Sequence, residues 1–123
     1  ILGTIAFNPA FAGPKNEWQK KFPEWGAFRE LQINELNKAN TINAIVFAHK
    51  DDVFEDPQTL SFFANFKGME FIDYSELKPT KCTWADVDKK MPSNKGHNIP
   101  QSKCFTKYLE EKNYLISFLE NIL

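Results

Sequence analysis

The chain has 123 residues, the length of one domain, and its 42% hydrophobic residues, with twelve phenylalanines, are enough for a packed core. Its net charge of −1 at pH 7 provides no basic field of the kind that binds nucleic acid or anionic membranes. No apolar run approaches the roughly 20 residues of a membrane-spanning helix. We therefore expect no nucleic-acid partner and no membrane span.

The first expected element is a strand over residues 2–7, LGTIAF, which the turn-forming pair Asn8-Pro9 ends. Residues 10–23 contain glycine and prolines without a sustained period, and they predict a loop or a short helix. Residues 24–39 carry apolar side chains at roughly helical spacing and predict a helix. Because the chain starts directly on apolar residues, without a methionine, we expect that further residues precede it.

Residues 42–47, INAIVF, form an apolar run with branched side chains, which is typical of a parallel strand buried on both faces. Open α/β sheets hold their ligands and reactive groups at the carboxyl ends of the strands. We therefore expect the chemistry of this protein just after this strand. The polar residues found there are His49, Lys50, Asp51 and Asp52.

A second helix is expected after the central strand, with Asp56 as its N-cap, Pro57 at its first position and Gly68 at its end. Residues 69–74 predict a third strand. Residues 76–96 are polar and lysine-rich without periodicity, and we interpret them as an insertion or a lid-like loop.

Residues 102–123 predict a final helix with Ser102 as its cap and an apolar stripe along one side. Strands that alternate with helices pair in parallel through right-handed crossovers. We therefore predict one unit of the α/β class over residues 1–123. It is a three-layer αβα arrangement whose short parallel sheet belongs to a larger one, because its apolar edge strand needs a neighbour.

A carboxylate and a histidine are the first candidates for catalysis. Asp51 or Asp52 lies at the end of the central strand, and His97 lies in a Gly-His-Asn turn before the last helix. In an Asp-His pair the carboxylate fixes the tautomer of the imidazole and stabilises its charged form, so that the other ring nitrogen can act as a base. The alternative is that both are ordinary polar residues of loops.

The order of these elements resembles the C-terminal half of an α/β-hydrolase. In that family a strand of the form φφφφ-Gly-x-x-Asp carries the triad acid, and a Gly-His turn and a closing helix follow. Residues 44–51, AIVFAHKD, match this strand with Asp51 at the acid position. Gly96-His97 matches the histidine turn, and residues 102–123 match the closing helix.

The resemblance implies a serine hydrolase that cleaves a carboxylic ester or a related small acyl substrate, without a cofactor or a metal. Asp51 would orient His97, and His97 would activate a serine. The resemblance also implies substrate contacts for Asn8 and Pro9, at the end of the first strand, and for Trp18 in the aromatic segment that follows.

The sequence departs from the family pattern at three points. Ala48 stands where the family usually has glycine, and residues 76–96 are longer than the corresponding segment in most members. No Gly-x-Ser-x-Gly nucleophile elbow occurs in the 123 residues. We therefore expect the serine upstream, an association with that N-terminal portion or another chain, and no esterase activity of the 123 residues alone.

Two other functions stay open. A non-catalytic α/β interaction module would bind a protein partner through its edge strand and its phenylalanine-rich faces. A metal site formed by His49, Asp51, Asp52 and His97 has suitable ligand types but lacks a typical ligand spacing.

The two cysteines, Cys82 and Cys104, are too few for a disulfide framework and favour a reduced interior and a cytoplasmic location; a single bridge is the alternative. Cys104 could serve as a nucleophile with His97, although a small buried residue is the favoured interpretation. The aromatic residues of the segment 11–28 are core under a loop or, by the resemblance, part of an acyl pocket.

Overall fold

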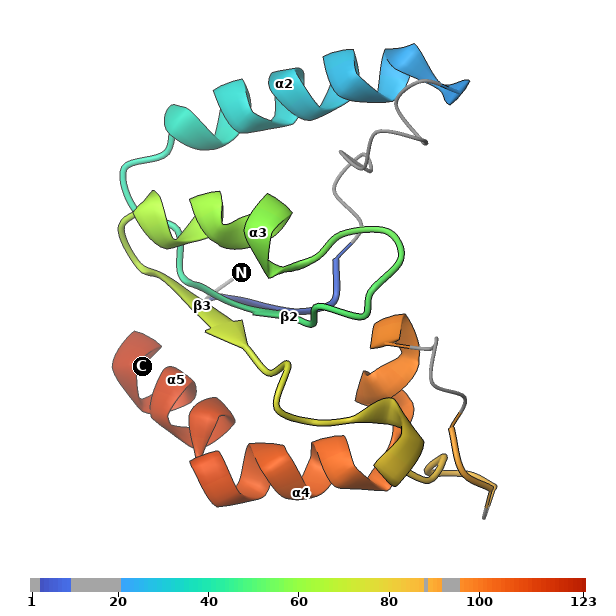
Figure 1. Ribbon diagram of the computed structural model, residues 1–123. Coiled ribbons are helices and arrows are strands. Elements are labelled where there is room, and N and C mark those ends of the chain that lie inside the picture. The colour runs from blue at the N-terminus through green and yellow to red at the C-terminus, as the bar shows by residue number, and fades with distance from the viewer. Residues whose placement is uncertain (1–2, 10–20, 88, 92–95) are drawn as a thin grey trace.

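The computed structural model describes residues 3–9, 21–87, 89–91 and 96–123. Its centre is a parallel sheet of three strands in the order β1-β2-β3 (Figure 1). The α/β class and the parallel pairing predicted from the sequence are confirmed. The strands are β1 (Thr4–Phe7), β2 (Ala44–Ala48) and β3 (Met69–Asp73).

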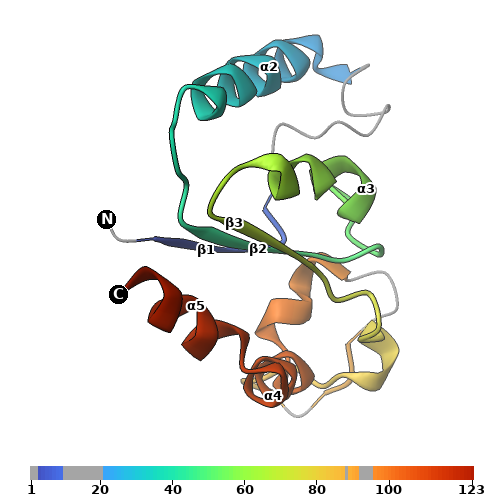
Figure 2. The same ribbon diagram turned by 90° about the vertical axis from the view of Figure 1, so that its left-hand side faces the viewer.

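Helices cover both faces of the sheet (Figure 2). On one face, α2 (Pro23–Asn37) connects β1 to β2, while α3 (Pro57–Leu60) and the 3-10 helix η1 (Ser61–Asn65) connect β2 to β3. On the other face lie α4 (Lys103–Lys112) and α5 (Tyr114–Ile122). Among the helices of the described residues, none has both the length and the apolar character that crossing a bilayer requires.

The central strand β2 contributes to two hydrophobic cores, because successive side chains of a strand point to opposite faces. All five of its residues are buried, as predicted for residues 44–47, but the strand begins two residues later than the predicted 42–47 and includes Ala48. Ile45 and Phe47 pack with Phe105 of α4, and the rings of Phe47 and Phe105 lie 5.7 Å apart. Val46 packs with Leu60 on the side of α3.

Two of the predicted helices differ from the observed ones. The helix that starts at Pro57 keeps its Asp56 cap but narrows to a 3-10 helix after Leu60. The single helix predicted over residues 102–123 is divided at Asn113, whose φ of 57° is left-handed. Asparagine tolerates this conformation better than most side chains, so α4 and α5 take different directions.

α2 is attached to the body by an ion pair. Arg29 is 8% exposed, and its guanidinium lies 3.1 Å from the carboxylate of the fully buried Glu55. It also donates to the Thr59 carbonyl at 2.7 Å. Phe28 and Leu31, two of the apolar residues at helical spacing, are exposed.

The segment 76–96 is anchored on the side of α4 where it is described. It contains a 3-10 helix, η2 (Pro79–Lys81), and an antiparallel bridge joins Trp84 to Ser102. Cys82, a residue of this segment, is buried in the core. Its role as a lid stays a prediction, as does the assignment of the whole chain to one unit.

Candidate active site

The carboxyl edge of β2 brings a histidine and an aspartate together. The Nδ1 atom of His97 lies 2.8 Å from Oδ2 of Asp52, although 45 residues separate them in the chain. His97 belongs to the 3-10 helix η3 (Gly96–Gln101), which leads into α4. Because a carboxylate only accepts hydrogen bonds, this contact places a proton on Nδ1.

The surroundings of Asp52 hold its carboxylate in one orientation. Its side chain is fully buried, and its other oxygen accepts the backbone N–H of Phe54 at 2.8 Å. The ring of Phe54 also packs edge-on against the imidazole of His97, with centroids 4.9 Å apart. The His97 side chain remains 35% exposed, and no hydrogen bond engages its Nε2 atom within the described residues. With Nδ1 directed to Asp52, Nε2 is the ring nitrogen left for a ligand.

Asp51, which matches the acid position of the family motif, is not the partner of His97. Its side chain is 36% exposed, and its Oδ2 atom lies 3.9 Å from Nδ1 of His49. The chain turns after β2, with the Asp52 N–H donating to the His49 carbonyl at 3.1 Å. This turn directs Asp51 outward and Asp52 inward, which the sequence could not distinguish.

Gly96 explains why a glycine precedes the histidine. A Cβ atom at this position would lie 2.4 Å from the carbonyl carbon of Asp51 and 2.6 Å from its oxygen. Any side chain would therefore push the histidine turn away from the aspartate turn. The glycine of the Gly-His pair allows the backbones of the two turns to lie in close contact.

Asn8 fastens the histidine turn to the sheet. Its amide nitrogen donates to the carbonyls of Gly96 at 3.0 Å and His97 at 3.1 Å. Its side-chain oxygen accepts the hydroxyl of Tyr74, which lies just after β3. Asn8 is only 2% exposed, so the structure gives its side chain a supporting contact; the predicted contact with substrate stays a prediction.

Tyr74 is a permanent donor in this network. Burial raises the pKa of its phenol far above the ordinary value of 10.0, and the nearby Asp52 carboxylate raises it further, although the Asn8 hydrogen bond lowers it. The phenol therefore stays protonated and continues to donate to Asn8. Its polar role was not predicted, since a tyrosine at the end of an apolar strand gives no sign of one in the sequence.

The other predicted substrate contacts are only partly described. Pro9 is half-buried and follows Asn8 at the same end of β1. Trp18 lies outside the described residues, as does most of the aromatic segment that contains it. Their roles stay predictions.

A metal site at this position is not supported by the arrangement of side chains. The fully buried His49 has both ring nitrogens within hydrogen-bond distance of backbone groups, Nε2 of the Leu77 carbonyl at 2.6 Å and Nδ1 of the Asp51 N–H at 3.0 Å. In the part of the chain that is described, no three histidine, cysteine or acidic side chains gather as metal ligands would.

The cysteines form a disulfide, so the expectation of two reduced thiols is wrong for this structure. Cys82 and Cys104 are 22 residues apart in sequence, with Cα atoms 5.6 Å apart. A bonded sulfur is not a nucleophile, which removes the cysteine alternative. Because disulfides persist mainly in oxidising compartments, the bridge also weighs against a cytoplasmic location, which stays a prediction.

Comparison with known proteins adds no assignment. No protein-family model, no curated protein and no solved structure was found to match this chain. A function is therefore inferred from the geometry of the site.

Proposed function

We propose that this chain is the C-terminal part of a serine hydrolase of the α/β-hydrolase type, which cleaves a carboxylic ester or a related acyl substrate. The observation that carries the proposal is the 2.8 Å contact between the His97 imidazole and the buried Asp52 carboxylate at the carboxyl edge of β2. The strand order, the Gly-His turn and the closing helices on the opposite face support it.

The chemistry follows from the orientation of His97. With its Nδ1 proton donated to Asp52, Nε2 is left as the base that takes the proton of a serine hydroxyl when its oxygen attacks the acyl carbonyl. Nε2 then passes this proton to the leaving group. Asp52 stabilises the imidazolium between the two steps. The acyl group is then bound to the serine oxygen. Water attacks it in the same way, with Nε2 as the base, and releases the acid and the free serine.

The serine and the oxyanion hole would come from upstream of these residues, since the sequence contains no nucleophile elbow. Within the described residues β1 pairs only with β2, and its other edge offers a place for that portion. Thr4 and Asn8 direct their N–H groups to β2, donating to Asn43 and Phe47. In a parallel ladder alternate residues face opposite sides, so Ile5 and Phe7 direct theirs outward, where a further strand would pair.

The first test uses the purified 123-residue chain with a p-nitrophenyl ester. We expect no turnover above the buffer rate, because the nucleophile is absent. Clear turnover that purifies with the chain would contradict the proposal, as would an upstream coding sequence without a Gly-x-Ser-x-Gly between a strand and a helix.

The second test compares two neighbouring carboxylates in a longer polypeptide that carries such an elbow. Asp52→Asn should lower kcat by a factor on the order of 10⁴, as loss of a triad acid does. Asp51→Asn is the matched control and should leave kcat nearly unchanged, because Asp51 does not contact His97. Equal effects of the two substitutions would overturn the assignment of Asp52.

The exposed edge and apolar surfaces favour a second function, a non-catalytic module that binds a protein partner. Ile5 and Phe7 of β1 are 38% and 40% exposed. Phe28 and Leu31 line an apolar groove along α2. For this function, Ile5→Pro should abolish partner binding while Asp52→Asn leaves it intact. A loss of ester hydrolysis in Asp52→Asn of the longer polypeptide favours the hydrolase instead.

A further inference from the structure

His49 is a buried histidine next to the Asp52–His97 pair, and the proposed reaction does not use it. Its side chain is fully buried, with Nε2 2.6 Å from the Leu77 carbonyl oxygen. The Asp51 backbone N–H lies 3.0 Å from Nδ1. A carbonyl only accepts and a backbone N–H only donates, so these contacts require a neutral ring with its proton on Nε2.

This tautomer holds the turn that carries Asp52. The Asp51 N–H is bound by the ring of His49, and the Asp52 N–H is bound by the His49 carbonyl at 3.1 Å. Two successive backbone N–H groups are thus fixed on one residue. With its backbone fixed, Asp52 directs Oδ1 to the Phe54 N–H at 2.8 Å and Oδ2 to His97.

Two other polar groups near the ring, the Asp51 carboxylate and the Tyr74 hydroxyl, do not hydrogen-bond to it, so the backbone contacts determine its tautomer. The Asp51 carboxylate lies 3.9 Å from Nδ1, which is beyond hydrogen-bond distance. On the other side the ring packs against Tyr74, with centroids 5.1 Å apart. The Tyr74 hydroxyl donates to Asn8, so it does not compete for the imidazole.

We propose that His49 is a positioning residue, which as the neutral Nε2–H tautomer holds the turn over residues 49–52 so that Asp52 faces His97. A catalytic consequence of this role rests on the proposed function. The geometric role does not, and NMR spectroscopy of the folded chain can test it without activity.

The chain contains only two histidines, so their ring ¹⁵N shifts can be assigned without ambiguity. At a pH where both rings are neutral, we expect the wild-type chain to show His49 as the Nε2–H tautomer and His97 as the Nδ1–H tautomer. If His49 carries its proton on Nδ1, the proposal is overturned. If His97 is not Nδ1–H, the Asp52–His97 pair itself fails, which is a separate result for the proposed function.

Two variants then separate the contacts of the His49 ring. His49→Asn places a side-chain oxygen near the position of Nδ1 and keeps an acceptor for the Asp51 N–H. His49→Gln places an amide nitrogen near the position of Nε2 and keeps only the donor for Leu77. Each variant leaves His97 as the sole histidine, and an amide ¹H–¹⁵N spectrum verifies the fold.

We expect His97 to stay predominantly Nδ1–H in His49→Asn. In His49→Gln it should change to a majority of Nε2–H, the form that dominates for a histidine in water. Retention of Nδ1–H in a folded His49→Gln, or its loss in both variants alike, would overturn the proposal. Should His49→Gln not fold, the wild-type tautomer of His49 and the His49→Asn spectrum still decide, because loss of Nδ1–H in folded His49→Asn is incompatible with the proposed contact.

Discussion

A few buried residues determine the position of His97, mainly through contacts with the backbone of its turn. Asn8 donates to the carbonyls of Gly96 and His97, and its side-chain oxygen accepts the Tyr74 hydroxyl. Gly96 allows the turn to lie directly on the backbone of Asp51. The imidazole itself makes one charge-assisted contact, with Asp52. Its position is therefore determined before its chemistry is considered.

Because of Tyr74, the free energy of unfolding should decrease as the pH rises into the alkaline range. Burial raises the pKa of its phenol above the ordinary value of 10.0, so the folded chain keeps a proton that the unfolded chain loses. The unfolded state then binds fewer protons, and the free energy of unfolding falls as the pH rises, by up to about 1.4 kcal/mol per pH unit for one proton.

Urea unfolding from about pH 9 to about pH 11, across the ordinary range of tyrosine ionisation, measures this slope. Tyr74→Phe should show a shallower slope than the wild type. Its remaining slope includes Tyr108, whose pKa is also raised by burial. Identical slopes for wild type and Tyr74→Phe would show that Tyr74 ionises freely in the folded chain.

Much of this site could be predicted at the residue scale, and its limits have physical reasons. A histidine turn and an acid at a strand end follow from the sequence pattern. The choice between Asp51 and Asp52 does not, because it depends on the direction of one turn, which the buried ring of His49 fixes. The roles of Asn8 and Tyr74 depend on contacts across 66 residues or more.

At the scale of elements, the alternation of apolar and polar segments predicted the order of strands and helices. It did not predict how α2 is attached. Its apolar residues at helical spacing include Phe28 and Leu31, which are exposed, whereas Arg29 is buried. A buried arginine needs a buried acid, and Glu55 lies in a loop that periodicity does not describe.

The ion pair of Arg29 and Glu55 should contribute strongly when broken from one side. Arg29→Met removes this ion pair from the buried Glu55 carboxylate, and we expect the free energy of unfolding to fall by roughly 3–5 kcal/mol. The double variant Arg29→Met/Glu55→Leu should recover most of this loss, because no charge is left buried. Urea unfolding of the single and double variants tests both statements. Additive losses would contradict this account of the pair.

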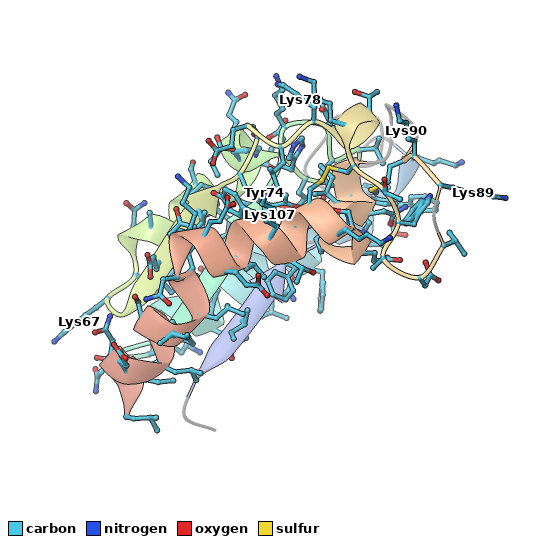
Figure 3. All side chains as sticks on the ribbon, turned by 90° about the horizontal axis from the view of Figure 1, so that it is seen from below. Lys67, Tyr74, Lys78, Lys89, Lys90 and Lys107 are labelled. Carbon is cyan, nitrogen blue, oxygen red and sulfur yellow. A yellow bond between two sulfur atoms is a disulfide. The ribbon has the colours of Figure 1, made fainter. Side chains whose placement is uncertain are left out.

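The disulfide ties the end of η2 to the first turn of α4 (Figure 3). It closes a loop that contains His97 and spans 22 residues. A cross-link of this length lowers the conformational entropy of the unfolded chain and so raises the free energy of unfolding by about 3 kcal/mol. We expect Cys82→Ala/Cys104→Ala to unfold at a correspondingly lower urea concentration than the oxidised wild type.

Reduction of the wild type should reproduce the effect of the double variant, and the same reductant should leave the double variant unchanged. Alkylation with and without reduction reports whether the purified chain is bridged. If both cysteines are alkylated in the unreduced, unfolded chain, the bridge is absent.

For the whole molecule, the two faces of the sheet are covered, but within the described residues both edge strands, β1 and β3, pair only with β2. β1 pairs with β2 on one side, and Ile5 and Phe7 direct their N–H groups to the other. An apolar edge strand of this kind is a template for another strand. We expect the 123-residue chain to self-associate at high concentration.

Ile5→Pro tests this expectation, because it removes an outward N–H group and leaves the β1–β2 hydrogen bonds in place. Sedimentation velocity over a range of concentrations should show a shift to larger species for the wild type and less of it for Ile5→Pro. Leu119→Lys, an exposed change on α5, is the matched control for apolar surface outside the edge. If Leu119→Lys disrupts association and Ile5→Pro does not, α5 rather than the edge of β1 is the contact surface.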